Sequence, residues 1–292
     1  MPRVNLVLQV SYVWFFFTLA ALNTNDLGDF VALTLMSKTP HVVLTVMCLA
    51  VSAWAVKDGV SVVTHYSGFF MLVAIVVLIT SILLTVNQID LGNFLPILDM
   101  PFLSYVHGVH IIATIPFGEL VVFLIITPAV SLAECDPGKR LLGGFVIGGL
   151  TVLFVLLRDI AVLGNTLPMF TLPALVTHRL VNIGTVFSRM EILFAVILIM
   201  LLFFKITFLY YVSVLSLARL ANLASYRRLI LAAGALIVAY GLTLYHSPIE
   251  HSAWARETTP FLWTFFEMLV PLATVLIAKI RKLPSMSGMK GA

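Results

Sequence analysis

The sequence predicts an all-α polytopic membrane protein with about eight transmembrane helices, one of them discontinuous. Of the 292 residues, 61% are hydrophobic and 10% are charged, and the mean hydropathy is +1.10. Soluble domains are ~45 to 50% apolar and ~25% charged, so the excess requires lipid as solvent. Apolar runs of about 20 residues, the length that crosses the hydrocarbon core, recur along the chain. One of these runs, 107–130, is interrupted near its middle.

The apolar runs place the spans as follows. We expect helices at about 5–23, 40–56, 68–86, 107–130, 140–163, 186–212, 228–246 and 259–279. The first run follows Arg3, as in a signal peptide, but it is longer than the ~7 to 15 apolar residues of a secretory segment and is interpreted as a span.

The segments between the spans are polar or short. Residues 23–40 carry Asp26 and Asp29 near their start and are expected to form a short amphipathic helix at the interface, not a span. Residues 1–282 are predicted to form a single transmembrane domain. The polar tail 283–292 is predicted to be disordered and cytoplasmic.

Lysine and arginine positions predict the orientation. With the N-terminus inside, the cytoplasmic set is Arg3, Lys57, Lys139, Arg140, Arg219, Arg227, Arg228, Lys279, Arg281, Lys282 and Lys290. The outer set is Lys38, Arg158, Arg179 and Arg256. This excess on one side predicts that both termini are cytoplasmic, and basic residues in short loops favour membrane topology over nucleic-acid binding.

The interrupted run carries the main candidate site, Ile115, Pro116, Phe117, Gly118 and Glu119. Pro116 has no amide hydrogen and its ring clashes with the carbonyl of Ile112, while Gly118 adds backbone freedom, so helical hydrogen bonding is expected to lapse. Half-helix ends at membrane depth commonly hold a ligand or ion. A carboxylate within a span costs at least ~2.5 kcal/mol unless it faces a polar interior. The alternative is a packed proline kink with Glu119 bonded to a neighbouring helix.

Other charged residues are weaker candidates. Arg189 and Glu191 begin the sixth span, where they would order an outer gate or meet a charged ligand, or else snorkel and complement the helix dipole. Glu267, four residues before Pro271, is interpreted as part of a structural kink. His107 and His110 share a helix face, but without a third ligand they predict no metal site.

Four stretches form a distinctive set: LGDFVALTLMSKTP (27–40), DGVSVVTH (58–65), IPFGELVVFLIITP (115–128) and SRMEILFAVIL (188–198). Together they resemble the spore germination permease family, the GerAB-type B subunits of germinant receptors in the amino acid/polyamine/organocation transporter superfamily. The resemblance implies a LeuT-like bundle with a ligand site at the middle of the membrane. It also implies an A-type membrane subunit and a C-type lipoprotein subunit as partners, in the cell membrane or the spore inner membrane.

The resemblance is incomplete in two places. Family members usually have ten helices with the sixth one broken, so this chain is expected to begin at the third and to lack the other discontinuous helix. The family's Gly-hydrophobic-Glu linker reads Gly59-Val60-Ser61 here and ends in His65, so its charge pair is absent. A misassigned start codon, a truncated gene and a divergent relative would each explain the difference.

The resemblance implies a germinant receptor subunit that recognises a small, amino acid-like nutrient and signals germination to its partner subunits. One alternative is a secondary active amino acid transporter coupled to protons or sodium, with Glu119 carrying the proton. Another is a truncated paralogue that binds nothing. No enzyme is expected, because the sequence shows no nucleophile with a base and no metal set at one depth, and no cofactor, metal or nucleic-acid partner is predicted.

Overall fold

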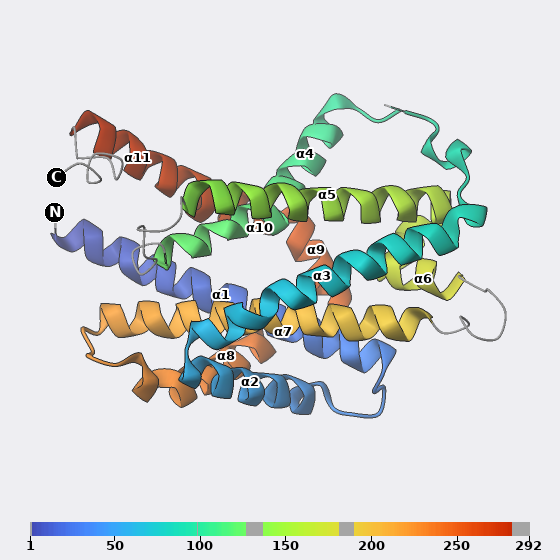
Figure 1. Cartoon of the computed structure of the whole chain (residues 1–292). Helices are drawn as coiled ribbons and strands as arrows, with labels where there is room; N and C mark the ends of the chain where they lie inside the picture. Colours follow the sequence, from blue (N-terminus) through green and yellow to red (C-terminus); the bar gives the residue numbers. More distant parts are fainter. Residues whose placement is uncertain (1, 98, 127–136, 181–189, 282–292) are drawn as a thin grey trace. The chain divides into compact units, whose positions relative to one another are not determined.

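The computed structural model describes residues 2–97, 99–126, 137–180 and 190–281, and all regular structure within these ranges is helical (Figure 1). Eight helical segments there are long and apolar enough to cross a membrane. They are Leu6–Thr34, His41–Asp58, His65–Gln88, Phe102–Ile125, Gly138–Met169, Glu191–Leu220, Tyr226–Leu244 and Thr259–Ile280. The predicted class, an all-α polytopic membrane protein with eight spans, is confirmed.

The chain divides into two compact units, Met1–Asp99 with Ile126–Leu244 (unit 1) and Met100–Ile125 with Tyr245–Ala292 (unit 2). Unit 1 contains α1 (Pro2–Thr34), α2 (His41–Asp58), α3 (Val60–Thr85), α5 (Pro137–Leu163), α6 (Pro173–Leu180), α7 (Met190–Leu220) and α8 (Ile230–Leu244). Unit 2 contains α4 (Phe102–Ile112), α9 (Pro248–Glu257), α10 (Thr259–Thr264) and α11 (Val270–Ile280). The single transmembrane domain and the LeuT-like arrangement stay predictions, and the tail 283–292 lies outside the described residues.

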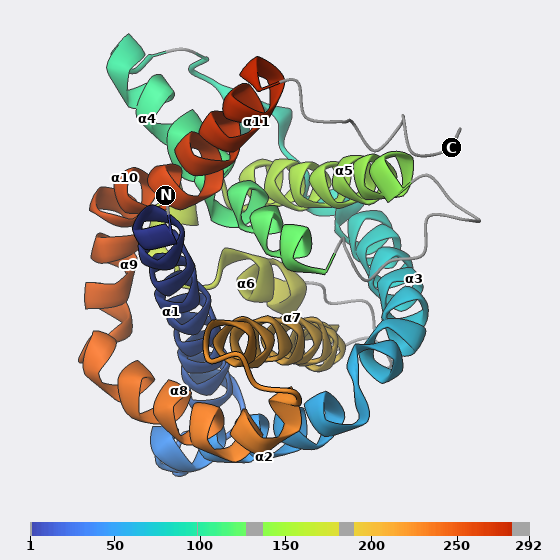
Figure 2. The ribbon, with the colours of Figure 1, turned by 90° about the vertical axis from the view of Figure 1, so that its left-hand side faces the viewer.

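Helix α7 is the centre of unit 1. It packs against α1, α2, α3, α6 and α8, which surround it where it is seen nearly end-on in Figure 2. Its sequence is apolar on all faces, as expected of a helix enclosed by others. Ile206 and Leu209 of α7 and Phe15 and Leu19 of α1 are buried in this core.

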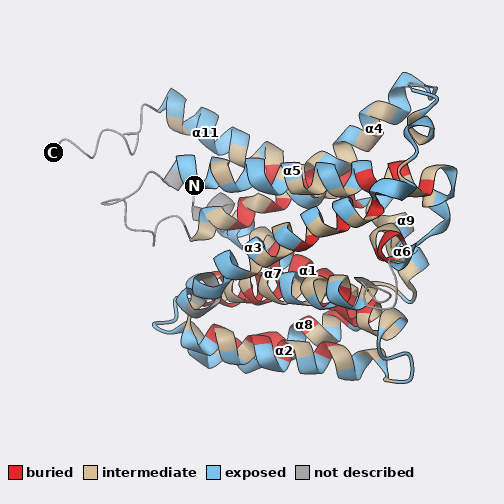
Figure 3. Ribbon diagram, turned by 45° about the vertical axis from the view of Figure 1, so that its right-hand side comes forward, coloured by how far each residue is buried: buried red, intermediate tan, exposed pale blue. Residues whose placement is uncertain are grey.

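The outer faces of unit 1 are exposed and apolar. In Figure 3 the exposed residues lie along the outward sides of α2 and α3. They include large side chains such as Trp54, Phe69 and Leu83. Contiguous exposed apolar surface of this kind is rare on soluble monomers and is ordinary on a face that meets lipid.

The prediction of a separate interfacial amphipathic helix at 23–40 is wrong, because α1 continues without interruption to Thr34. Its polar residues find partners within unit 1. Asn23 donates to the carbonyl of Leu19 at 2.8 Å, and Asn25 donates to the carbonyl of Gly241 in α8 at 2.7 Å. Asp29 pairs with His41 of α2 at 3.3 Å. Satisfied polar side chains allow a helix to continue where composition alone favoured a boundary.

Two short helices lie between the predicted spans. Helix α6 lies between α5 and α7, and α9 precedes the last span. The start of α9 carries a recognisable signal, because the Ser247 hydroxyl accepts from the amide of Glu250 at 3.2 Å and Pro248 occupies the first turn. A serine followed three residues later by glutamate is a capping pattern that the sequence already contains.

Candidate functional site

The span Phe102–Ile125 is discontinuous, as predicted. Helix α4 gives way to a π-helical turn at Ala113–Phe117 and then to a 3₁₀ stretch at Gly118–Ile125. The break is at Ile115, whose φ of −118° and ψ of 111° are extended. A residue before proline is driven out of the helical region by the proline ring, and Pro116 supplies no amide hydrogen.

The backbone around the break is satisfied locally. Thr114 is fully buried, and its hydroxyl donates to the carbonyls of His110 at 2.9 Å and Ile111 at 3.0 Å. The Gly118 amide donates to the carbonyl of Thr114. In a span, such internal partners are required because lipid offers none.

The last span of unit 2 is distorted too, and it packs against the break. Between α10 and α11 it forms a π-helical turn at Phe265–Leu269, which contacts the Gly118–Ile125 stretch, while α10 contacts the turn at Ala113–Phe117. Pro271 lies just beyond this distortion and displaces the carbonyl four residues earlier, that of Glu267. The kink expected at Glu267 is therefore present.

The Glu267 side chain reaches the break itself. A β-carbon added at Gly118 would lie 2.7 Å from the Glu267 Cδ and 3.2 Å from the carbonyl oxygen of Ala113. Gly118 has ordinary helical angles, with φ of −66° and ψ of −30°. Backbone freedom was the role predicted for Gly118, whereas in the structure a β-carbon there would have to displace the Glu267 carboxylate.

Two carboxylates are buried within unit 2. Glu119 and Glu267 are each 8% exposed, one in the first turn after the break and the other against Gly118. Buried carboxylates within spans mark polar interiors, since ionised side chains in hydrocarbon are costly. This arrangement is suited chemically to an ammonium group, a cation or a transferable proton.

Two histidines lie on the same side of α4 and contact α10. The His110 Nε2 lies 2.6 Å from the Thr264 hydroxyl, which itself donates to the carbonyl of Pro260 at 2.6 Å. Thr264 has one hydroxyl hydrogen, so His110 is the donor and carries its proton on Nε2. His107 stacks on Phe261 at 6.2 Å. The residues described in the structure contain no group of three metal-binding side chains.

Unit 1 contains a second buried polar cluster, which sequence reasoning missed. The Arg158 guanidinium in α5 donates from Nη2 to the Asp159 carboxylate at 2.6 Å and from Nη1 to the Ser81 hydroxyl in α3. Arg158 and Asp159 are 4% and 3% exposed. Arg158 was counted in the outer set of basic residues, and the structure shows that its charge is enclosed between helices.

His178 of α6 completes the Arg158 cluster. Its Nδ1 lies 2.5 Å from the carbonyl of Ala174, so Nδ1 carries the hydrogen and Nε2 accepts from Arg158 Nη1 at 3.4 Å. The ring stacks on Phe194 of α7 at 4.3 Å. Burial, opposed by the Ala174 hydrogen bond and reinforced by the Arg158 charge, lowers the pKa of His178.

The predicted site residues belong to both units. Ile115, Pro116, Phe117, Gly118 and Glu119 surround the break in unit 2. Glu191, in the first turn of α7 in unit 1, is half-buried, and its charge favours protonation of His178. Arg189 lies outside the described residues. A lone arginine beside aspartate within a span, as in Arg158-Asp159, is the sequence signal that could have identified the Arg158 cluster.

Comparison with known proteins identifies the family of this chain. The family model described as "Spore germination protein" matches residues 4–248, most of the chain. This chain belongs to that family of spore germination permeases, which are membrane proteins of a permease or receptor type. It is 25% identical over 281 residues to "Spore germination protein KB" of Bacillus subtilis (strain 168), covering 93% of this chain and 74% of that protein. No solved structure matches the chain.

Proposed function

We propose that this chain is the B-type membrane subunit of a spore germinant receptor and that it recognises a small, amino acid-like nutrient. Membership of the spore germination family supports a receptor or permease role. The observation that carries the proposal further is the break at Ile115 beside two buried carboxylates, Glu119 and Glu267. This combination offers a polar centre between the two spans of unit 2.

An amino acid carries an ammonium group and a carboxylate group, and the proposed site offers a partner for each. The carboxylates of Glu119 and Glu267 suit an ammonium group. The Gly118–Ile125 stretch begins at the break, and the dipole of a helix start favours a carboxylate. Arg189 and Glu191 remain proposed contributors at the outer gate.

The binding signal would pass to partner subunits. Ligand binding shifts a two-state equilibrium only by its differential affinity for the two states, and an interrupted helix supplies a hinge between them. The proposed partners are the A-type membrane subunit and the C-type lipoprotein subunit. The proposed location is the cell membrane or the spore inner membrane, with both termini cytoplasmic.

Equilibrium binding of labelled amino acids to the purified chain in lipid nanodiscs tests this proposal. We expect Pro116→Ala and Glu119→Gln each to weaken binding of the best ligand at least ~10-fold, a change of ~1.4 kcal/mol. Gly108→Ala is the matched control, because a β-carbon there meets nothing within 4 Å. Unchanged affinity in both site variants would refute the proposed site.

The second candidate function is secondary transport of an amino acid with proton or sodium coupling. The buried Glu119 favours it, since intramembrane carboxylates commonly carry coupling protons. Counterflow of labelled substrate in proteoliposomes separates the two functions. A receptor binds without exchange, whereas a transporter exchanges and loses coupling in Glu119→Gln.

A further inference from the structure

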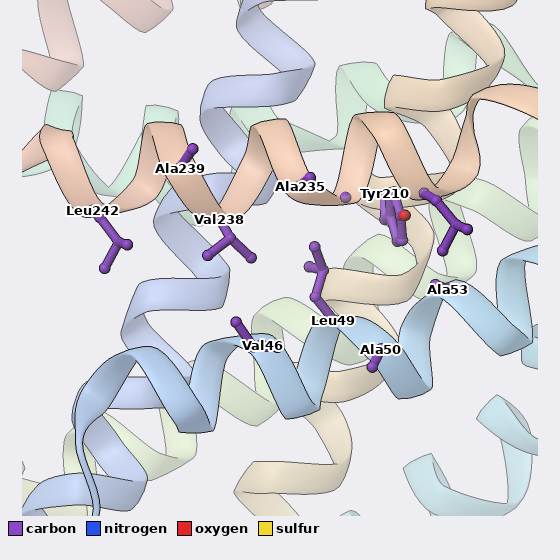
Figure 4. Close-up of a pocket in the computed structure, with 11 residues that line it drawn as sticks. Val46, Leu49, Ala50, Ala53, Tyr210, Ala235, Val238, Ala239 and Leu242 are labelled. Carbon is purple, nitrogen blue, oxygen red and sulfur yellow. The ribbon is translucent and has the colours of Figure 1, made fainter.

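Unit 1 has an apolar groove between α2 and α8, with a volume of about 470 Å³ (Figure 4). The side chains of Val46 and Leu49 project into it from α2 and those of Val238 and Leu242 from α8. Small residues on both helices, such as Ala50 and Ala235, keep it open. Its volume is within the ~300 to 1,000 Å³ of ordinary ligand pockets.

The chemistry of the groove excludes a polar nutrient as its occupant. Among its lining residues in the structure, Tyr210 carries the one polar side-chain group. That hydroxyl already donates to the carbonyl of Ile230. An occupant therefore has to be hydrocarbon, because a polar group buried here without a partner is destabilised by several kcal/mol in an apolar medium.

The groove has the length of one lipid leaflet. Its lining on α8 runs from Leu231 to Leu242, which is about 16 Å at the ~1.5 Å rise of an α-helix. Half of the ~30 Å hydrocarbon core is about 15 Å. One extended acyl chain matches this dimension.

One end of the groove is basic. Lys57 follows Ala53 of the lining by one helical turn, and Arg227 and Arg228 precede Leu231 by about one turn. All three cations are exposed. The Tyr226 hydroxyl donates to the carbonyl of Val56 at 3.3 Å, which fixes these cations at the same end.

The charge at this end is positive on balance. Asp58 is the acidic residue beside Lys57 at the end of α2, so three cations face one carboxylate. Arg219, exposed at the end of α7, adds a further cation to this end of unit 1. Basic residues beside a groove between spans are the chemistry that holds an anionic lipid headgroup.

We propose that the α2–α8 groove binds one anionic phospholipid, with an acyl chain between the helices and the phosphate on Lys57, Arg227 and Arg228. An anionic phospholipid accounts for both observations, because its acyl chain matches the length of the groove and its phosphate matches the basic end. A transmembrane helix of a partner would use the small residues but would leave the basic end unexplained. The proposal is independent of the nutrient site, because it uses none of the residues proposed to bind the nutrient.

Native mass spectrometry of the full chain, released from nanodiscs of equal phosphatidylglycerol and phosphatidylcholine, tests the proposal. We expect one retained phosphatidylglycerol in preference to phosphatidylcholine. Ala235→Phe, which fills the groove, should reduce retention of either lipid at least fivefold. The matched control is Ala232→Phe, an equal enlargement at an exposed position of α8 that does not line the groove.

The headgroup part is tested separately. Arg227→Gln with Arg228→Gln should abolish the preference for phosphatidylglycerol while leaving retention of phosphatidylcholine unchanged. The control, Lys139→Gln with Arg140→Gln, removes the same charge from the exposed start of α5 and should keep the preference. Circular dichroism and thermal unfolding confirm that each variant is folded.

Two results would overturn the proposal. One is equal retention of the two lipids by the unaltered chain, with Ala235→Phe and Ala232→Phe behaving alike. The other is a photoreactive residue at position 235 that crosslinks to a partner subunit and not to lipid in native membranes, which would assign the groove to a partner helix.

Discussion

The discontinuous helix of unit 2 and the Arg158 cluster of unit 1 both hold charged groups inside candidate spans, but their backbones differ. Around Glu119 the helix is interrupted at Ile115. Around Arg158 and Asp159 helix α5 is continuous, and the charges are compensated by each other and by side chains from α3 and α6. Buried charge therefore does not by itself require a broken helix, whereas an internal proline kinks or breaks the helix.

The difference has a functional meaning. A cation already bonded to aspartate, serine and histidine has its donors in use and is suited to holding α3, α5 and α6 together. Carboxylates beside an interruption are suited to a ligand or a proton. The Arg158 cluster is accordingly a structural element in this comparison, and the break is the proposed site of recognition.

The largest expected effect comes from removing the negative charge of the Arg158 cluster. Asp159→Asn leaves a buried guanidinium without its carboxylate, and we expect a loss of ~3 to 5 kcal/mol in the free energy of unfolding. Arg158→Met with Asp159→Leu should recover most of this loss, because no charge is then buried. Denaturant unfolding in detergent micelles measures both. The comparison fails if the double variant is as unstable as the single one, or if the exposed control Asp58→Asn is equally costly.

The contact between Gly118 and Glu267 is tested by adding a methyl group at position 118. Gly118→Ala should destabilise unit 2 by ~1 to 3 kcal/mol, since Glu267 must move away from the added methyl group. In a Glu267→Ala background the same change should have little effect. Gly108→Ala in α4 should be neutral or stabilising by up to ~1 kcal/mol, because space is open there. Equal effects of Gly118→Ala in the two backgrounds would show that the carboxylate does not occupy this space.

The lowered pKa of His178 makes stability depend on pH. The unfolded chain binds a proton near pH 6.5 and the folded chain binds it at lower pH, so the stabilisation is complete above pH 6.5 and is lost as pH falls below it. The groups that act on His178 are Arg158, Asp159 and Glu191. The slope is at most ~1.4 kcal/mol per pH unit for one proton.

Unfolding temperatures between pH 7.5 and 5.5 measure this slope. His178→Gln should flatten it, whereas the exposed His246→Gln should leave it as in the unaltered chain. An identical pH dependence in all three proteins would remove His178 as the cause. Helix α6 lies outside the candidate spans.

The smallest expected effect concerns the bond between α4 and α10. Thr264→Val removes the acceptor of the His110 hydrogen bond and should cost ~0.5 to 1.5 kcal/mol. Thr274→Val in the same span is the control, because that hydroxyl is exposed and bonds within its own helix. Thermal unfolding that fails to distinguish the two variants would show that this bond adds nothing to unit 2.

Local chemistry accounts for what could be predicted from the sequence. Composition and the length of apolar runs determined the membrane class and the eight spans, because hydrocarbon thickness sets the length of a helix. Pro116 determined the position of the break, because its ring acts on Ile112 and Ile115 within the same chain segment. These effects need no knowledge of neighbouring helices.

Contacts between distant segments were decided only by the tertiary structure. Helix α1 continues past Asn25 because Gly241, far along the chain, accepts its amide hydrogen. Arg158 can be buried because Ser81 and His178, on other helices, accept hydrogen bonds from its guanidinium. Glu267 meets Gly118 through the packing of two spans. The partner of a polar residue in a membrane protein is set by helix packing, which no local pattern encodes.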